Sequence, residues 1–518
     1  MLPTSMVSWL SRWWRGLLQV CFLLLCLRFQ VAAFREVYPY YWPTLILVVG
    51  SMVLGAWKPV AALFAFTLAV PLLDGLAQTA MLTCAFPPAL VFSALWIGVT
   101  ARSWRGSSET DAGIHKIASY PTPSHSHTPS HLFFVTLITD ILITAMLLSL
   151  AYQIWHHRDL PGLWSAFSNR SVFGYGEQFY FITSAYLWLQ GFFFFRYLGP
   201  HIQETAISTW IKPMFIIYGV TMVVFVLIQY FCNIPEGWQK AGFQSPYEDI
   251  SSFGSLSVAV FIFALTIQRR VSWPRLIGQA LCLSVLLALV IASWSRATWL
   301  AGIIFSLVIA CLRLPRWCSL LIILLVVATI VVINGSANSD TFRSHLYLTR
   351  LVALVRLENV ASKSPERMEL YHRAYRMLQK HPLTGHGIGS FYLTSKDYAT
   401  HGDYRENEPD FAHNIFLQIA TEQGVPIAAL LAGLCSWTLY QGFSAWIKRR
   451  NASKDGSDHA LACLGVLLAL SAYLETGMTG NSLNVYVSNQ FFFWFLVAAL
   501  IMTSEGINGC ACQEDFRW

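Results

Sequence analysis

Long apolar runs separated by short polar segments recur along most of this chain of 518 residues. Many runs are about 20 residues long, the length that an α-helix needs to cross the hydrocarbon core of a bilayer. The apolar residues are continuous within each run rather than alternating, and this pattern excludes a transmembrane β-barrel. We therefore predict an all-α polytopic membrane protein.

The length and flanking charges of the runs predict about 12–14 transmembrane helices. The candidate segments are 16–34, 43–56, 59–73, 79–101, 132–152, 177–198, 211–232, 253–268, 276–293, 297–312, 317–334, 413–445, 459–478 and 484–503. The chain thus divides into an N-terminal transmembrane region, 1–334, with about 11 spans, a large polar loop, 335–412, and a C-terminal region, 413–518, with about three spans and a tail.

Short basic segments between closely spaced helices predict the orientation. The segments 269–270, 313–316 and 448–450 carry Arg or Lys and should be cytoplasmic by the positive-inside rule. Threading the spans between them places both termini in the cytoplasm and the loop 335–412 outside. That loop is itself basic, but loops longer than about 60 residues translocate regardless of their charge.

The composition agrees with a membrane protein, since 55% of residues are hydrophobic and only 12% are charged. The net charge of +7 reports cytoplasmic loops and gives no indication of nucleic-acid binding. The 11 cysteines lie mostly in apolar runs and predict neither a disulfide framework nor a zinc site. The polar segment 102–131 holds His125, His127 and His131, but no carboxylate or cysteine spacing completes a metal site, so we interpret it as a flexible linker.

The large loop contains a predicted helix over 365–381, because Pro365 and Glu366 favour a helix N-terminus. Its apolar residues recur at three- and four-residue spacing and predict one buried stripe. The stripe residues are Met368, Tyr371, Ala374, Tyr375 and Leu378. A glycine-rich turn, 382–389, follows and lets the backbone approach a ligand closely. The polar segment 394–410 is predicted to be a mobile surface segment.

Two arginines are candidates for binding an anion. Arg296 lies between two spans at the outer face, where a charge is a functional hypothesis, although an arginine at a tight hairpin can also extend its charge to the interface. Arg367 lies in the first turn of the loop helix, where an anion gains from the guanidinium and the helix dipole. The alternative for Arg367 is a surface pair with Glu366 or Glu369.

His413 is the candidate proton acceptor, since histidine titrates near neutrality. The alternative is a helix-start histidine whose ring is satisfied by the backbone. Asn414 is expected to orient His413 or to cap the helix. Further along, Glu422 is expected to make a buried polar contact or to mark a helix end, and a break is predicted near Pro426.

Other charged residues add to this picture. Arg343 and Arg350 precede the loop helix and are expected to touch phosphate or to anchor an amphipathic segment on the membrane. Asp140 lies inside a span and is expected to pair with a basic residue of another helix. Several arginines and one histidine at the outer face suit a substrate with a diphosphate at the lipid surface.

Three motifs, SWSRATWLAG around Arg296, SPERMELYHRAYRMLQKHPLTGHGIGSF around Arg367 and FAHNIFLQIATEQGVP around His413, together resemble the O-antigen ligase family. This superfamily also contains Wzy-type O-antigen polymerases and bacterial O-oligosaccharyltransferases. The resemblance covers residues 290–430, and Tyr371 stands where relatives often carry Trp.

The resemblance implies a GT-C-like membrane fold with a large helical periplasmic loop, in the bacterial inner membrane. It implies a metal-independent glycosyltransferase, without cofactors, whose donor is a glycan on undecaprenyl diphosphate. Arg296 and Arg367 would hold the diphosphate and His413 would activate the acceptor, with Asn414, Tyr371 and the two loop arginines 343 and 350 as further substrate contacts.

The acceptor is left open by the motifs. Lipid A–core is expected first, a growing O-antigen chain second and a protein third. A lipid-linked glycan transporter is an alternative from another class, but it would require polar residues at mid-membrane depth.

Overall fold

A computed structural model of the chain describes residues 4–36, 42–78, 88–106, 131–158, 180–202, 207–232, 250–268, 273–293, 295–336, 365–399, 411–452, 458–478, 480 and 487–510. Within these ranges the regular structure is entirely helical. The prediction of an all-α fold is therefore confirmed.

Each predicted span contains a described helix. These helices are α1 (Thr4–Glu36), α2 (Trp42–Trp57), α3 (Pro59–Gln78), α4 (Pro88–Gly106), α6 (His131–His156), α8 (Tyr180–Ile202), α9 (Ile207–Cys232), α11 (Ile250–Thr266), α12 (Trp273–Ala292), α13 (Arg296–Arg313), α14 (Arg316–Ser336), α21 (Val425–Ala452), α22 (Asp458–Gly477) and α24 (Val487–Cys510). Among the described helices, six contain segments long and apolar enough to cross a membrane, namely α1, α6, α9, α13, α21 and α22, and shorter apolar helices accompany them. The chain is thus a polytopic membrane protein.

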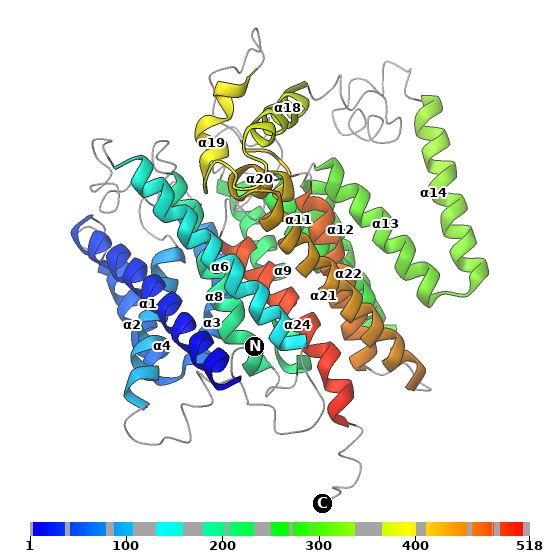
Figure 1. The fold of residues 1–518 in the computed structure, drawn as a ribbon. Helices are drawn as coiled ribbons and strands as arrows, with labels where there is room; N and C mark the ends of the chain where they lie inside the picture. The colour runs from blue at the N-terminus through cyan, green and yellow to red at the C-terminus, as the bar shows by residue number, and fades with distance from the viewer. Residues whose placement is uncertain are drawn as a thin grey trace, which may run out of the picture.

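The long helices form a bundle that carries a small helical layer at one end (Figure 1). This layer consists of α18 (Pro365–Lys380), α19 (Ser390–Thr394), the 3₁₀ helix η4 (Ser395–Tyr398) and α20 (Ile415–Gln423). In Figure 1, α1 begins and α24 ends toward the opposite end of the bundle. The layer therefore lies opposite to the first turn of α1 and the last turn of α24, as in the threading of the predicted spans.

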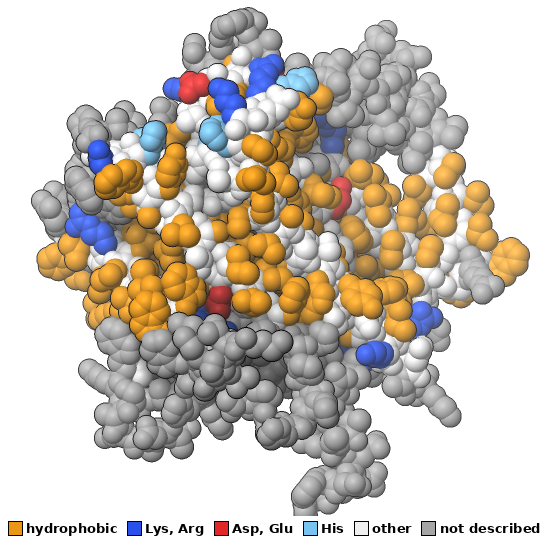
Figure 2. Space-filling model, viewed as in Figure 1, with side chains coloured by type: hydrophobic (Ala, Val, Ile, Leu, Met, Phe, Trp, Pro, Cys, Tyr) orange, Lys and Arg blue, Asp and Glu red, His pale blue; other side chains and the backbone are white. Residues whose placement is uncertain are grey.

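The surface of the bundle is apolar over a broad band (Figure 2). Large apolar side chains on α2, α12 and α14 point outward, and Trp317 is 82% exposed. Lys, Arg and His side chains gather above the band, over the end that carries the helical layer. An exposed apolar surface of this extent marks a surface for lipid or a partner, and in this helical membrane protein we assign it to lipid.

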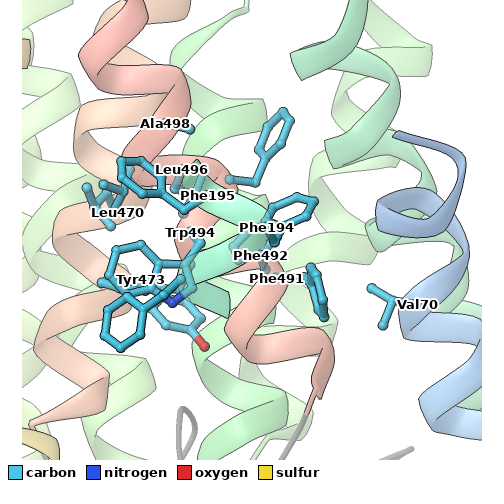
Figure 3. Packing of buried hydrophobic residues seen from close by; sticks show 14 of the residues in the cluster. Val70, Phe194, Phe195, Leu470, Tyr473, Phe491, Phe492, Trp494, Leu496 and Ala498 are labelled. Atoms are coloured by element: carbon cyan, nitrogen blue, oxygen red, sulfur yellow. The ribbon is translucent and has the colours of Figure 1, made fainter. Parts of the chain in front are cut away.

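The core of the bundle is densely aromatic where α8, α22 and α24 meet (Figure 3). The rings of Phe194 and Phe491 have centroids 4.6 Å apart, and those of Phe195 and Trp494 lie 5.3 Å apart. A Cβ at Gly191 would lie 2.5 Å from Trp494 Cδ1, so the glycine allows α8 and α24 to approach closely. Small residues serve this purpose in membrane helix packing because lipid tails supply no hydrophobic drive between helices.

Asp140 pairs with basic residues of two other helices, as expected. Its Oδ2 lies 3.0 Å from Arg15 Nε and its Oδ1 lies 2.6 Å from Arg196 Nη1. The three side chains join α1, α6 and α8. A buried carboxylate between two guanidinium groups has its charge compensated within the protein, which burial requires.

Three local predictions need correction. The segment 413–445 is not one helix, because α20 ends at Gln423 and α21 starts at Val425. The predicted break is confirmed, but it lies at Gly424, whose φ is 89°. The helix over 365–381 is confirmed as α18, but its buried stripe is displaced, as described below. The segment 394–410 was predicted to be mobile, yet 395–398 forms η4, and 400–410 lies outside the described residues.

We predict that Asp140→Asn lowers the free energy of unfolding by about 3–5 kcal/mol, because two half-buried guanidinium groups lose their buried counter-charge. Thermal unfolding of the purified protein in detergent measures this change. Asp397→Asn, at an exposed position of η4, is the matched control and should unfold like the parent. Equal midpoints for both variants would show that the ion triad does not stabilise the bundle.

Candidate active site

The helical layer is held together by a small apolar cluster of its own. The buried members are Leu370, Ala374, Met377, Phe391 and Ala412, and the side chain of Leu417 packs against them. These residues come from α18, from α19 and from the segment that leads into α20. The cluster therefore fixes α18 against α20, and with it the relative position of the motifs around Arg367 and His413.

The buried face of α18 differs from the predicted stripe. Tyr375 is 61% exposed, whereas Arg373 is only 1% exposed. Arg373 Nε lies 3.5 Å from Glu369 Oε1, and Arg376 Nη1 lies 3.8 Å from the same oxygen. Glu369, which was considered as a surface partner for Arg367, thus engages two arginines further along the helix.

The turn 382–389 joins its backbone to the end of α20. The N–H of His386 donates to Thr421 O at 2.9 Å, and the N–H of Gly387 donates to Glu422 O at 2.7 Å. In return, the N–H of Val425 donates to Pro382 O at 2.8 Å. A helix leaves its last carbonyl groups unpaired, so the turn satisfies the C-terminal carbonyls of α20.

Glycine is required along this contact for two reasons. Gly385, Gly387, Gly389 and Gly424 have φ values of 65°, 97°, 70° and 89°, which L side chains rarely adopt. There is also no room for a Cβ, which at Gly389 would lie 2.5 Å from Phe181 Cα and at Gly385 would overlap the Glu422 carbonyl group. The backbone of this turn closely approaches α20 and α8, and an approach to a ligand stays a prediction.

Helix α6 supports the same turn through two polar side chains that the sequence analysis did not single out. Ser149 Oγ accepts from Ile388 N at 2.8 Å and from Gln423 Nε2 at 3.0 Å. Gln153 Nε2 donates to the His386 carbonyl at 2.7 Å. The two residues are four apart and therefore share one helix face. This spacing is the sequence feature that could have identified them within an otherwise apolar span.

Glu422 makes the buried polar contact that was one of its two expected roles. The side chain is 3% exposed. Its Oε2 accepts from Gly389 N at 2.9 Å, and its Oε1 accepts from Gln418 Nε2 at 3.0 Å. Because α20 precedes the membrane span that begins at Val425, this carboxyl belongs to the helical layer of α18, α19, η4 and α20, which we call the outer layer. Burial raises the pKa of Glu422 to about 7, against the opposing effect of its hydrogen bonds.

His413 stands at the start of α20 with an unusual backbone. Its φ is 48°, and within the described residues it is the one non-glycine residue with a positive φ. Such conformations cost about 1–3 kcal/mol and cluster at functional sites. The side chain is half-buried. The next residue, Asn414, caps the helix, since its Oδ1 accepts from Leu417 N at 3.0 Å.

An aromatic triad anchors the segment just before His413. Phe411 packs against Tyr180 and Tyr392, with centroid separations of 5.4 Å and 4.9 Å. Tyr180 and Tyr392 lie 4.8 Å apart. The triad ties the approach to α20 to both α8 and α19, so the membrane bundle and the outer layer meet beside His413.

The two candidate arginines each lie in the first turn of a helix. Arg296 is the first residue of α13, directly after the cap residue Ser295, whose Oγ accepts from Thr298 N at 3.4 Å. Arg367 and Tyr371 lie one helical turn apart on α18, and both are half-buried. Figure 1 shows the start of α13, α18 and the start of α20 at the same end of the bundle.

Arg343 and Arg350, the remaining candidates for substrate binding, lie outside the described residues. In the parts of the chain that the structure describes, His, Cys, Asp and Glu side chains form no group of three or more that could hold a metal ion. The candidate groups that the structure does describe are Arg296, Arg367, His413 and the buried carboxyl of Glu422.

Comparison with protein families identifies one region of the chain. Residues 281–432 match the family model described as O-Antigen ligase. The matched region extends from α12 into α21 and contains Arg296, Arg367 and His413. No curated protein matches the chain.

We predict that Gly389→Ala destabilises the protein by at least about 1–3 kcal/mol, because alanine is strained at positive φ and its Cβ would meet the Phe181 backbone. The thermal midpoint in detergent and the rate of limited proteolysis in the loop measure the effect. Gly433→Ala is the control, since a Cβ there meets open space and alanine favours a helix by about 0.5–1 kcal/mol. An unchanged midpoint for Gly389→Ala would contradict the steric constraint.

Proposed function

Because residues 281–432 form a domain of the O-antigen ligase family, we propose that this membrane protein is a glycosyltransferase that moves a glycan from undecaprenyl diphosphate to an acceptor on the periplasmic side of the bacterial inner membrane. The observation that carries the proposal is the family match itself, which contains all three residues selected from the sequence. The helices that carry Arg296 and Arg367, and the start of α20 next to His413, lie at the same end of the bundle (Figure 1).

The orientation of this site rests on charge. Arg313 and the last turn of α21, which contains Arg449 and Arg450, lie at the end of the bundle opposite to the helical layer. Basic residues between closely spaced spans favour the cytoplasm, so the layer with His413 would face the periplasm.

Arg296 and Arg367 would bind the diphosphate of the donor. A helix dipole places partial positive charge at the N-terminus, so an anion is favoured there. A diphosphate in contact with the first turns of α13 and α18 would gain from the dipoles and from the guanidinium groups together. It would also gain most when charge builds on the leaving group, which is the requirement for electrostatic catalysis.

His413 would act as the general base. The acceptor hydroxyl oxygen attacks the anomeric carbon of the donor glycan as the bond from that carbon to the diphosphate oxygen breaks. The hydroxyl proton passes to a ring nitrogen of His413, and undecaprenyl diphosphate leaves. The fixed backbone of His413 and the cap at Asn414 would hold the ring in one position during this step.

The remaining substrate contacts follow from their positions. Tyr371 lies one helical turn from Arg367 and would contact the glycan next to the diphosphate. Asn414 uses its side-chain oxygen for capping, so its amide nitrogen would donate to a sugar hydroxyl. Arg343 and Arg350 would meet the phosphates or the lipid surface.

We propose lipid A–core as the acceptor, which makes the protein an enzyme of lipopolysaccharide biosynthesis. A Wzy-type polymerase and a protein O-oligosaccharyltransferase use the same donor and are the alternatives within the family. A lipid-linked glycan transporter is the alternative of another class.

We predict that His413→Ala lowers glycan transfer about 10²–10⁴-fold, the usual contribution of a general base. Arg367→Ala should lower it about 10²–10³-fold through lost charge stabilisation. The measurement is transfer by the reconstituted protein from a defined lipid-linked donor. His372→Ala, at an exposed position of α18, and Arg450→Ala, at the opposite end of the bundle, are the controls. Normal transfer by either site variant would refute its assigned role.

We predict that a deletion strain carries bare lipid A–core, without O-antigen, on a lipopolysaccharide gel. Core with a single repeat unit would identify a polymerase instead. An unchanged lipopolysaccharide ladder would point to protein glycosylation, and movement of lipid-linked glycan without transfer in proteoliposomes would indicate a transporter.

A further inference from the structure

A chain of hydrogen bonds leads from the glycine-rich turn to the residue before His413. Gly389 N donates to Glu422 Oε2 at 2.9 Å, and Gln418 Nε2 donates to Glu422 Oε1 at 3.0 Å. Gln418 Oε1 in turn accepts from Ala412 N at 3.4 Å. Gln418, Glu422 and Ala412 are all buried, at 1%, 3% and 0% exposure. Two side chains thus connect the turn, α20 and the backbone that enters the strained His413.

The direction of this chain is fixed by chemistry. Both ends are backbone N–H groups, which only donate, so each end of the side-chain pair must present an acceptor. The Glu422 carboxylate accepts at both oxygens. The Gln418 amide donates its N–H to this carboxylate, and its oxygen accepts from Ala412 N–H. One negative charge and one amide therefore satisfy every member of the chain.

We propose that Glu422, acting through Gln418, is a positioning residue that holds the backbone of His413, and that its carboxylate form is the one that does so. This inference rests on the proposed function of His413 as the base. If either Glu422 oxygen is protonated, its O–H, a donor, faces another donor, which is Gly389 N–H at Oε2 or the Gln418 Nε2–H at Oε1. If the Gln418 amide rotates so that its oxygen faces the protonated carboxyl, its N–H group then faces Ala412 N–H, and two donors again oppose each other. A buried donor left without an acceptor is costly.

Titration of Glu422 would then appear in the activity. Burial raises its pKa to about 7, while hydrogen bonds from Gly389, Gln418 and Phe391 favour the ionised form. The side chain should therefore gain a proton as the pH falls through about 7, and transfer should fall with it. Other titratable or charged groups lie on the described elements around α20. These groups are Arg367, Glu369, Tyr371, His372, Arg373, Tyr375, Arg376 and Lys380 on α18, His381 and His386 in the turn, Lys396, Asp397 and Tyr398 on η4, Tyr392 on α19, His156 and His157 at the end of α6, and His413 before α20.

The test exchanges the two side chains. Glu422→Gln alone leaves two amides between two N–H donors, so one donor is always unmatched, and kcat should fall about 10- to 100-fold. In the double variant Gln418→Glu/Glu422→Gln, the carboxylate accepts from Ala412 N–H and from the new amide, whose oxygen accepts from Gly389 N–H. The three bonds of the chain are restored, and transfer should return to within a few-fold of the parent.

Gln418→Glu alone changes the pH profile of activity. Two adjacent carboxyl groups can hydrogen-bond to each other and accept from both backbone N–H groups only when they share one proton. The activity of this variant should therefore fall as the pH rises, whereas that of the parent rises with pH. Thermal midpoints of all four proteins, measured at each pH, separate loss of position from loss of fold.

The outcomes distinguish this inference from the proposed function. If the parent protein transfers glycan and Glu422→Gln does so equally well, the positioning role is wrong. If the double variant remains as impaired as Glu422→Gln, the polarity argument is wrong. If the parent itself transfers no glycan, the proposed function fails before the exchange is tested.

Discussion

The contact between the turn 382–389 and the end of α20 is the constraint on which the outer layer depends. It is made by backbone against backbone, and it exists because Gly385 and Gly424 carry no Cβ. The contact satisfies the carbonyls that α20 leaves unpaired, and it places Gly389 N–H where Glu422 can accept from it. A side chain on any of these glycines would separate the two segments.

The membrane bundle extends this contact into a rigid support. Ser149 and Gln153 reach the turn from α6. From α8, Phe181 meets the turn at Gly389, and Tyr180 packs on Tyr392 of α19. The same two helices are joined at depth by Asp140 and Arg196. The proposed glycan transfer would need its reacting groups held at a fixed height in the membrane interface, and catalytic geometry is most accurate on well-packed elements.

Much of this arrangement could be predicted because apolar run length and short motifs report it directly. Each of the predicted spans contains a helix, and the helix of 365–381 and the break after Glu422 are present. The errors have a common cause, which is that tertiary contacts, not the apolar pattern, decide which polar side chains are buried. Pattern identifies Tyr375 as apolar, but α18 buries Arg373 instead because Glu369 compensates its charge. Likewise, the apolar pattern does not identify Ser149, whose partner lies 239 residues away.

The break at Gly424 is what turns an apolar helix into part of a candidate site. If 413–445 formed one straight span, Glu422 would lie about two turns inside it, where a carboxyl is costly without a partner. Because α20 ends at Gly424, before the span, Glu422 lies in the outer layer. There its carboxyl accepts hydrogen bonds from the backbone of Gly389 and Phe391. The short helix then presents His413 at its start and a polar, pH-sensitive support at its end. Hydrogen bonds from Ala412 to Gln418 and from Gln418 to Glu422 therefore join the sequence between His413 and Gly424 into one structural unit.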